Sequence, residues 1–148
     1  MCAVLDANQA GDVANSRDFA HINEFIRWMT RGGKIEVGGR LTVELSKLAQ
    51  FRRLMVQWER RGQIAIVSQS DLETEQRKIR NKIESDDPHV VALLRLGRSD
   101  TLITNDKLLI KDAKNRSLID RKVRVIRPTF ENKAATIRTR RILNSSDC

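Results

Sequence analysis

The sequence predicts an α/β fold, a three-layer α/β/α sandwich with a central, mostly parallel sheet. Short apolar runs alternate along the chain with amphipathic stretches, and strands separated by helices pair in parallel through right-handed crossovers. The length of 148 residues suits one compact domain with a core between two helical layers. We therefore expect a domain over residues 1–130, followed by a basic C-terminal tail over residues 131–148.

The first part of the chain predicts a strand and a helix. Residues 3–5 are an apolar run that ends abruptly at Asp6, as a buried strand would. Residues 16–18 can cap a helix, which Gly32 and Gly33 end. Apolar residues spaced by three and four predict one buried face of this helix, formed by Phe19, Ile22, Phe25, Ile26 and Met29.

The middle of the chain predicts two further strands with a long helix between them. Residues 35–37 form a short apolar run before two glycines, which we expect to be an edge strand. A helix is predicted over residues 41–61, with Glu44 in the gap of an apolar stripe, and residues 64–67 are the next strand. The stripe consists of Leu41, Leu48, Phe51, Met55 and Trp58.

Two helices are predicted between these strands and the next. Residues 70–73 fit a capping box, and the helix that they open is so highly charged that we expect it on the outer surface. Asp87 and Pro88 favour a second helix start, with Asp at the cap and Pro at the first helical position. This second helix is apolar nearly all round and ends at Gly97, so we expect it to be well buried.

The last part of the chain predicts two strands, a helix and a tail. Residues 101–104 and 123–126 are apolar runs with the pattern of buried strands, and residues 107–119 between them are expected to be helical. The tail from Glu131 onwards is polar and basic, so we expect it to be loosely ordered.

Four acidic residues are informative because of where they fall relative to these elements. Asp6 and Asp106 follow apolar strands, and parallel strands bring their carboxyl ends to one edge, where open α/β sheets place their sites. Asp87 begins a buried helix, and Glu44 lies on an apolar stripe. Singly, each has a structural explanation, such as a turn, a helix cap or an ion pair with an arginine. Together, clustered carboxylates repel one another unless a cation lies between them.

The chemistry of these residues favours Mg²⁺ or Mn²⁺ as the cation. Oxygen ligands of high charge density select these ions over zinc, and such ions activate water and stabilise charge on a phosphate. The sequence contains only two histidines, and its two cysteines lie at its ends, so a zinc site is not expected. His89, near the predicted site, either contacts substrate or has a structural role.

Several stretches occur in an informative order along the chain. They are residues 4–8, Glu44, residues 85–93 and residues 102–112. With these stretches the chain resembles the PIN-domain family of metal-dependent nucleases. The resemblance implies a three-layer fold with a parallel sheet, one or two Mg²⁺ or Mn²⁺ ions, and cleavage of RNA. It also implies which residues bind the metal and catalyse the reaction, namely Asp6, Glu44, Asp87 and Asp106.

The same resemblance implies secondary contributors to the site. Asp86 is the alternative to Asp87, because the register of this motif is open by one residue. Thr104 matches a small polar residue that family members often have two positions before the fourth acid, and Asp112 is an outer contributor. From its position two residues after Asp6, Asn8 either occupies a turn or orients Asp6 or a metal-bound water.

The charge balance favours nucleic acid as a partner. The chain carries 28 Lys and Arg against 19 Asp and Glu, a formal net charge of +9. Residues 121–141 hold eight basic residues and one acidic residue. Such a run is usually a solvated face, but its position after a predicted nuclease site favours contact with RNA phosphates. The residues expected to bind nucleic acid are Arg124, Arg127, Lys133, Arg138, Arg140 and Arg141.

The predicted function is that of a metal-dependent endoribonuclease, either the toxin of a toxin–antitoxin pair or an RNA-processing nuclease. The alternative is a catalytically inactive PIN-like domain that binds nucleic acid. A phospho-acceptor receiver domain is a third class, but that class needs paired acids after the first strand, where this chain has Asp6 alone.

The expected partners are RNA, an antitoxin-like protein and a second copy of the chain in a homodimer. No apolar run approaches the ~20 residues that span a bilayer, so no membrane partner is expected. The first ten residues carry an acid and lack the cations and long apolar core of a signal peptide, so we expect a cytoplasmic protein.

Overall fold

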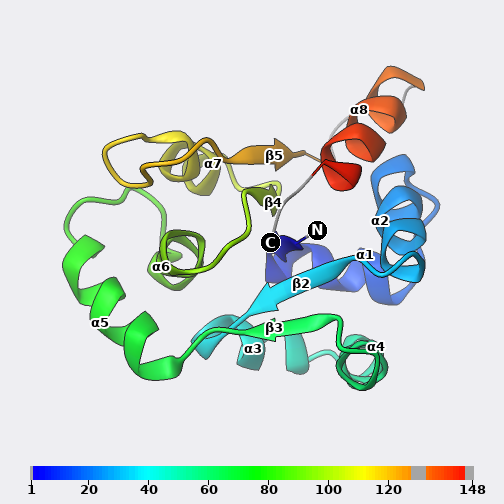
Figure 1. Cartoon of the computed structure of the whole chain (residues 1–148), viewed down its shortest axis with the longest axis horizontal. Coiled ribbons are helices and arrows are strands. Elements are labelled where there is room, and N and C mark those ends of the chain that lie inside the picture. The colour runs from blue at the N-terminus through cyan, green and yellow to red at the C-terminus, as the bar shows by residue number, and fades with distance from the viewer. Residues whose placement is uncertain (1, 128–132, 146–148) are drawn as a thin grey trace.

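A central sheet of five parallel strands runs through the structure, a computed structural model that describes residues 2–127 and 133–145 (Figure 1). The strand order is β3-β2-β1-β4-β5, and every neighbouring pair is parallel. The strands are β1 (Cys2–Leu5), β2 (Lys34–Val37), β3 (Ile64–Ile66), β4 (Thr101–Ile103) and β5 (Arg124–Ile126). The predicted α/β fold class with a parallel sheet is therefore confirmed.

Helices cover both faces of this sheet. They are the 3₁₀ helix η1 (Ala7–Gln9), α1 (Ala10–Ala14), α2 (Ala20–Thr30), α3 (Gly39–Ser46), α4 (Ala49–Arg60), α5 (Gln69–Ile79), α6 (Pro88–Leu96), α7 (Lys107–Lys114) and α8 (Lys133–Asn144). From β1 the chain steps outward to β2 and β3, then returns to β4 and β5 on the other side of β1. Because crossovers are right-handed, this reversal sends the later helices to the opposite face. Figure 1 shows α5, α6 and α7 on one side of the sheet and α1, α2, α4 and α8 on the other.

The core lies between the sheet and these two helical layers. Val4 on the central strand β1 and Leu102 on its neighbour β4 are fully buried, and so is Leu93 of α6. Phe25 of α2 and Trp58 of α4 meet edge to face, with ring centroids 6.1 Å apart. This packing makes the carboxyl ends of β1 and β4 a rigid scaffold. Within residues 2–127 and 133–145, no helix combines the length and apolar character needed to cross a bilayer.

The strand at residues 35–37 is not at the edge of the sheet, so that prediction was wrong. β2 lies between β1 and β3, whereas β3 is the edge strand on that side of the sheet and leaves Ile66 70% exposed. A short apolar run indicates that a strand is buried, but it does not show how many strands pair with it. The number of strands that pair with a given strand depends on the order in which the chain places its strands in the sheet.

The helix predicted over residues 41–61 is two helices, α3 and α4, separated at Lys47 and Leu48. The backbone of Leu48 is extended, with φ −86° and ψ 109°. Leu41 and Leu45 of α3 are buried, whereas Leu48 is exposed. The helices pack against different neighbours, α3 against α5 and α6 and α4 against α1 and β3, so one straight helix would not cover both.

Several helix ends also differ from the predicted ones. α5 begins at Gln69 with Ser68 at the N-cap position, so the capping box predicted at residues 70–73 was wrong. α7 ends at Lys114 rather than at residue 119, and Asn115 begins a turn after it. The predicted helix from Pro88 is confirmed, and Gly97 is its C-cap. Local cap signals are weak because several polar residues near a helix start compete for the same role.

The C-terminal segment contains a helix, α8, where a loosely ordered tail was predicted. α8 packs against α2 (Figure 1), and its Leu143 is buried. Arg140 pairs with Glu24 of α2 through two hydrogen bonds, Nη2 to Oε1 at 2.8 Å and Nε to Oε2 at 2.9 Å. The prediction was wrong for residues 133–144, because the amphipathic pattern and this pairing order the chain. Residues 131, 132 and 146–148 of the predicted tail lie outside the described residues.

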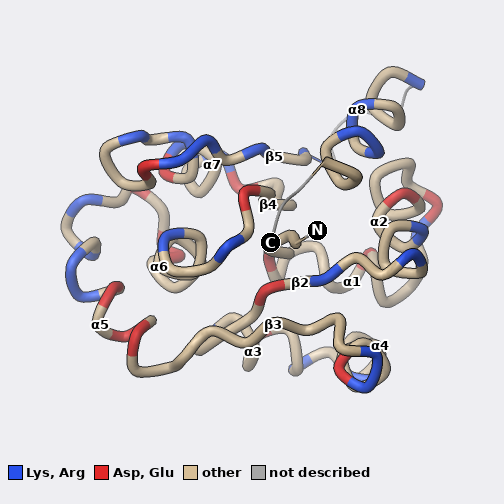
Figure 2. Tube along the Cα trace, in the orientation of Figure 1, with Lys and Arg blue, Asp and Glu red and all other residues tan. Residues whose placement is uncertain are grey.

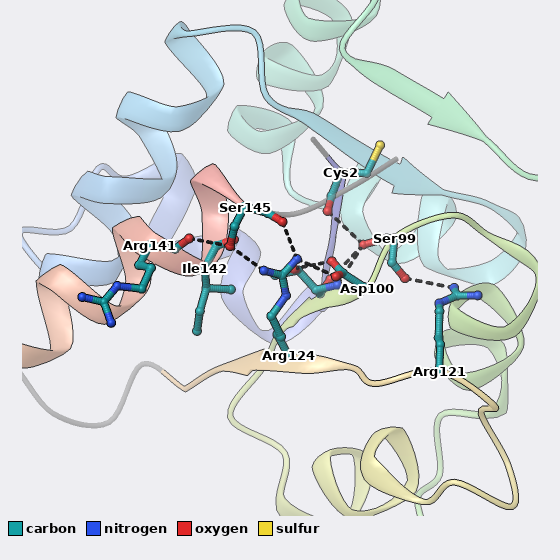
Figure 3. A network of polar contacts seen from close by, with 9 residues as sticks. Cys2, Ser99, Asp100, Arg121, Arg124, Arg141, Ile142 and Ser145 are labelled. Carbon is teal, nitrogen blue, oxygen red and sulfur yellow. Dashed lines mark hydrogen bonds and ion pairs between the residues drawn. The ribbon is translucent and has the colours of Figure 1, made fainter.

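A polar network ties the end of α8 to the amino edge of the sheet (Figure 3). Arg124, at the start of β5, donates from Nη2 to Asp100 Oδ2 at 2.5 Å and to the Ser145 carbonyl at 2.8 Å. Ser99 donates from Oγ to the carbonyl of Cys2 at 3.0 Å. These contacts lie where the strands begin, so they support the fold at the edge opposite Asp6.

Candidate functional site

Asp6 and Asp106 lie side by side at the carboxyl edge of the sheet. β1 and β4 are neighbours with Leu5 opposite Ile103, so the residues that follow them leave the sheet together. Thr104 connects the two acids, because its hydroxyl donates to Asp6 Oδ2 at 2.5 Å and accepts from the Asp106 amide at 3.0 Å. The predicted pattern of strand followed by acid thus brings both side chains to one place.

Each of these two acids also has a local structural contact. Asp106 is the N-cap of α7, where its Oδ1 accepts from the Leu109 amide at 2.8 Å. Asp6 precedes η1, where its Oδ1 accepts a long bond of 3.5 Å from the Asn8 amide. The cap contact uses one oxygen of Asp106, and its Oδ2 forms no hydrogen bond within the described part of the chain. A cap and a ligand role are therefore compatible for this residue.

Asp87 stands at the N-cap position of α6, but its side chain forms no cap hydrogen bond. Burial is the main cause that raises the pKa of Asp87 above 3.8, and the charges of Asp6, Asp106 and Glu44 raise this pKa further. These three acids are thus close enough to act on the Asp87 carboxylate. Asp86, the alternative in this motif, is exposed, and the geometry favours Asp87.

Glu44 reaches the same region from α3. Its Oε1 accepts from Arg40 Nε at 2.7 Å, and its Oε2 lies 3.1 Å from Nε2 of the buried His89 on α6. The same His89 nitrogen lies 3.9 Å from Asp87 Oδ1. Glu44 thus pairs with an arginine, as one of the structural explanations expected, and it also faces the acids.

The electrostatic environment of Asp6 agrees with this clustering. Burial is the main cause that raises the pKa of Asp6 above 3.8. Hydrogen bonds from Thr104 and from the backbone oppose the shift, while the charge of Asp106 adds to it. Negative charge is therefore disfavoured at two of the four acids, and a bound cation would relieve that cost.

The four acids face one region without forming a closed set of ligands. Among residues 2–127 and 133–145, no three His, Cys, Asp or Glu side chains are grouped as the ligands of one metal ion. The donor set nevertheless fits Mg²⁺ or Mn²⁺ in its chemistry, since Asp6, Asp87, Asp106 and Glu44 offer carboxylate oxygens and their charges act on Asp87. A cation there would need the carboxylates to move toward it.

Asn8, predicted as a secondary contributor, lies beside Thr104. Its Nδ2 is 3.4 Å from Thr104 Oγ1, and its Oδ1 accepts from Gln9 Nε2 at 3.0 Å. Asn8 is exposed, so it borders the site from the solvent side. These contacts favour a role in orienting Thr104, which in turn holds Asp6.

Asp112 supports the site from behind. Its buried carboxylate accepts from the backbone amides of Glu84, at 3.0 and 3.1 Å, and Ser85, at 2.8 Å. These residues open the loop that leads to Asp87. Asp112 thus fixes the path of this loop, and it has no contact with the other acids within the described part of the chain.

Replacement of Asp112 by Ala is expected to lower the free energy of unfolding. The amides of Glu84 and Ser85 would lose their acceptor, which costs about 1–3 kcal/mol for a buried donor. Chemical denaturation measures this loss, and Asp120→Ala, at an exposed position, is the matched control. An Asp112→Ala protein of unchanged stability would contradict the supporting role.

The predicted nucleic-acid-binding residues divide into two groups. Arg124 and Arg140 are engaged within the protein, with Asp100 and Glu24, respectively. The remaining four are exposed and form no ion pair with any described residue, and they are Arg127, Lys133, Arg138 and Arg141. Figure 2 shows where basic residues occur along β5 and α8. The predicted basic surface is reduced to the four exposed residues, because Arg124 and Arg140 are engaged in ion pairs.

Sequence reasoning missed one residue at the site. Arg40 contacts Glu44 from the preceding helical turn, and its spacing of four residues from Glu44 is a signal that would have identified the pair. The contact of His89 with Glu44 had no such signal, because the two residues are far apart in the sequence.

Comparison with known proteins identifies no relative. No family model matches the chain, and no curated protein or solved structure is significantly similar to it.

Proposed function

We propose that the protein is a PIN-like, metal-dependent endoribonuclease that hydrolyses RNA phosphodiester bonds with Mg²⁺ or Mn²⁺. The observation that carries the proposal is that Thr104 joins Asp6 and Asp106 at the carboxyl edge of the sheet, while Glu44 and Asp87 both lie close to His89. The charges of Asp6, Asp106 and Glu44 support it, because they raise the pKa of Asp87 in addition to the main effect of burial, against the opposing effect of His89. Buried groups with strongly interacting charges cluster at functional sites. The strands that carry Asp6 and Asp106 end at the sheet edge where α/β proteins place their sites.

The chain's own residues have separate roles in this proposal. Asp6, Asp87, Asp106 and Glu44 would hold the cation, which would supply an activated water and stabilise charge on the phosphate. Thr104 orients the Asp6 carboxylate through the bond of its hydroxyl to Oδ2. Asp112 holds the loop before Asp87. The paired strands β1 and β4 constrain the backbone on which Asp6 and Asp106 follow.

The basic surface supplies affinity for the rest of the RNA. Each exposed cation that neutralises a phosphate releases a counterion, so binding strengthens at low salt. The four exposed residues of this surface are Arg127, Lys133, Arg138 and Arg141. Arg127 follows β5, and the other three residues lie on α8, which packs against β5. Since β5 is the neighbour of β4 in the sheet, the surface belongs to the same half of the sheet as Asp106.

Cleavage of RNA should require Mg²⁺ or Mn²⁺. We expect defined single-stranded and structured RNAs to be cut in the presence of either ion, and cleavage to stop on addition of EDTA because the acids then lose the cation. Excess Mn²⁺ should restore cleavage, whereas Zn²⁺ should not substitute, since the site offers oxygen ligands. Gel analysis of end-labelled RNAs measures this, and cleavage that survives EDTA would contradict the proposal.

A catalytically inactive RNA-binding domain is the second candidate function. The observation that favours it is the lack of a three-residue ligand group within the described part of the chain. Binding and cleavage assays with the same RNAs distinguish the two functions. An inactive domain should bind RNA in a salt-dependent way and should not cleave it in the presence of Mg²⁺ or Mn²⁺.

A further inference from the structure

A chain of three contacting side chains leads from the interior to the solvent beside the acids. His89 is 1% exposed and contacts Glu44, which is 19% exposed and contacts Arg40, which is 67% exposed. His89 lies on α6 and the other two residues lie on α3, so the contacts join two helices. A buried residue thus fixes the carboxylate that in turn holds the arginine.

The position of Arg40 is not explained by helix stability. Arg40 is in the first turn of α3, where the helix dipole disfavours positive charge. An Arg that precedes a Glu by four residues is also the weaker orientation of such a pair. Exposed ion pairs contribute little to stability in any case. Helix stability therefore does not require an arginine at this position.

The geometry leaves most of the guanidinium group available. Nε donates to Glu44 Oε1 at 2.7 Å, and the two Nη groups form no hydrogen bond with the described residues. A guanidinium binds phosphate oxygens through two parallel N–H groups, which gives both strength and a defined direction. The contact with Glu44 limits the freedom of the side chain, so less entropy is lost when the Nη groups bind a ligand.

The charges around Arg40 indicate what that ligand is. Asp6, Asp87, Asp106 and Glu44 together repel an approaching phosphate, because their charges act on a common region. An arginine at the border of that region offsets the repulsion and orients a polyanion beside the acids.

We propose that Arg40 binds a backbone phosphate of the RNA next to the acids, held in place by Glu44 and, through Glu44, by His89. This inference rests on the proposed nuclease function and names a substrate-binding residue for it. Glu44 can hold Arg40 and also bind the cation, because a carboxylate has about four acceptor positions. The contacts to Arg40 and His89 use two of them. Hydrogen bonds of this kind commonly orient a metal-binding carboxylate.

The test compares Arg40→Gln and Arg40→Lys with the matched control Arg31→Gln. Arg31 is an exposed arginine at the C-cap of α2, before β2 begins, and so lies at the opposite edge of the sheet. We expect Arg40→Gln to raise KM for RNA about tenfold and to change kcat less than about threefold, because binding rather than chemistry is affected. The KM of Arg40→Lys should lie between those of the parent and Arg40→Gln, since lysine keeps the charge and loses the paired N–H groups.

Binding in EDTA, where the RNA stays intact, gives an independent readout. Fluorescence anisotropy over a range of salt concentrations should show a slope smaller by about 0.7 for Arg40→Gln, the value for one phosphate contact on a single strand. Arg31→Gln should keep the parent slope. His89→Ala should raise KM in the same direction as Arg40→Gln, and His89→Gln, which retains an N–H donor, should restore part of the loss.

Two results overturn the inference in distinguishable ways. If the parent cleaves RNA but Arg40→Gln matches Arg31→Gln in KM and salt slope, Arg40 does not bind phosphate and the nuclease function stands. If the parent neither cleaves nor binds RNA under any ion, the proposed function fails and the inference fails with it. Circular dichroism verifies that each variant keeps the parent fold.

Discussion

Replacement of Asp6 by Asn is expected to reduce RNA cleavage by orders of magnitude while leaving the protein at least as stable as the parent. Asn keeps the size of the side chain and an acceptor for the Thr104 hydroxyl, but it removes the charge that a cation needs. The activated water and the stabilised phosphate would be lost together. Initial rates at saturating Mn²⁺ measure the effect, with the exposed Asp71→Asn as control.

The pKa of Asp6 determines the sign of the stability change. Burial raises this pKa above 3.8, so the folded state holds the proton more tightly than the unfolded state. Stability due to Asp6 is then highest at low pH and falls as the pH rises from 3.8 through the folded-state pKa. Asn carries no charge, so the variant avoids the free-energy cost of a buried, ionised carboxylate and is more stable than the parent near neutral pH. This gain in stability disappears as the pH is lowered toward 3.8.

Two outcomes decide what Asp6 does. A variant that cleaves RNA at the parent rate contradicts the catalytic assignment. A variant that loses cleavage because it unfolds shows that Asp6 is a structural cap of η1. Asp106→Asn is a useful second variant, since Asn is also a favourable N-cap and can accept from the Leu109 amide in its place.

Replacement of Arg140 by Met is expected to lower the thermal midpoint by several degrees near neutral pH. The buried carboxylate of Glu24, 3% exposed, would keep its contact with Arg27 and lose both hydrogen bonds from α8. A buried charge that loses its partner destabilises a fold more than the pair itself stabilises it. Met preserves the apolar length of the side chain, and Arg138→Met, at an exposed position of the same helix, is the control.

This loss should depend on pH in a defined way. The hydrogen bonds of Arg140 are the main cause that lowers the pKa of Glu24 below 4.5, so the stabilisation is present above 4.5 and is lost as the pH falls through the folded-state pKa. The difference between Arg140→Met and the parent should therefore shrink in acid. The double variant Glu24→Gln with Arg140→Met should recover part of the stability. A loss that is independent of pH would mean that packing of α8, and not the ion pair, is responsible.

Local patterns in the sequence were sufficient for the elements and for two of the acids. Apolar runs of three or four residues between helices predict buried parallel strands because only crossovers through helices connect such strands. Asp6 and Asp106 follow from the same rule, since an acid within a few residues after a parallel strand lies at its carboxyl edge. In these cases the residues that give the pattern are within a few positions of the structural feature that the pattern predicts.

The break between α3 and α4 shows where local patterns stop being sufficient. Leu41 and Met55 belong to one apolar stripe at helical spacing, yet the stripe is divided at Leu48 because its two halves pack against different helices. The tail shows the same limitation. Its charge predicts exposure, but α8 is held by Glu24 on a helix more than a hundred residues earlier in the chain.

The sequence by itself determined the fold class and the edge at which Asp6 and Asp106 lie, since both depend on the alternation of neighbouring segments. Only the tertiary structure decided that Glu44 meets His89, and that Arg124 and Arg140 are engaged inside the protein. The physical reason is distance along the chain. Periodicity and capping act over a few residues, whereas the partner of a charged side chain is selected by which helices the sheet brings together, at whatever separation in sequence.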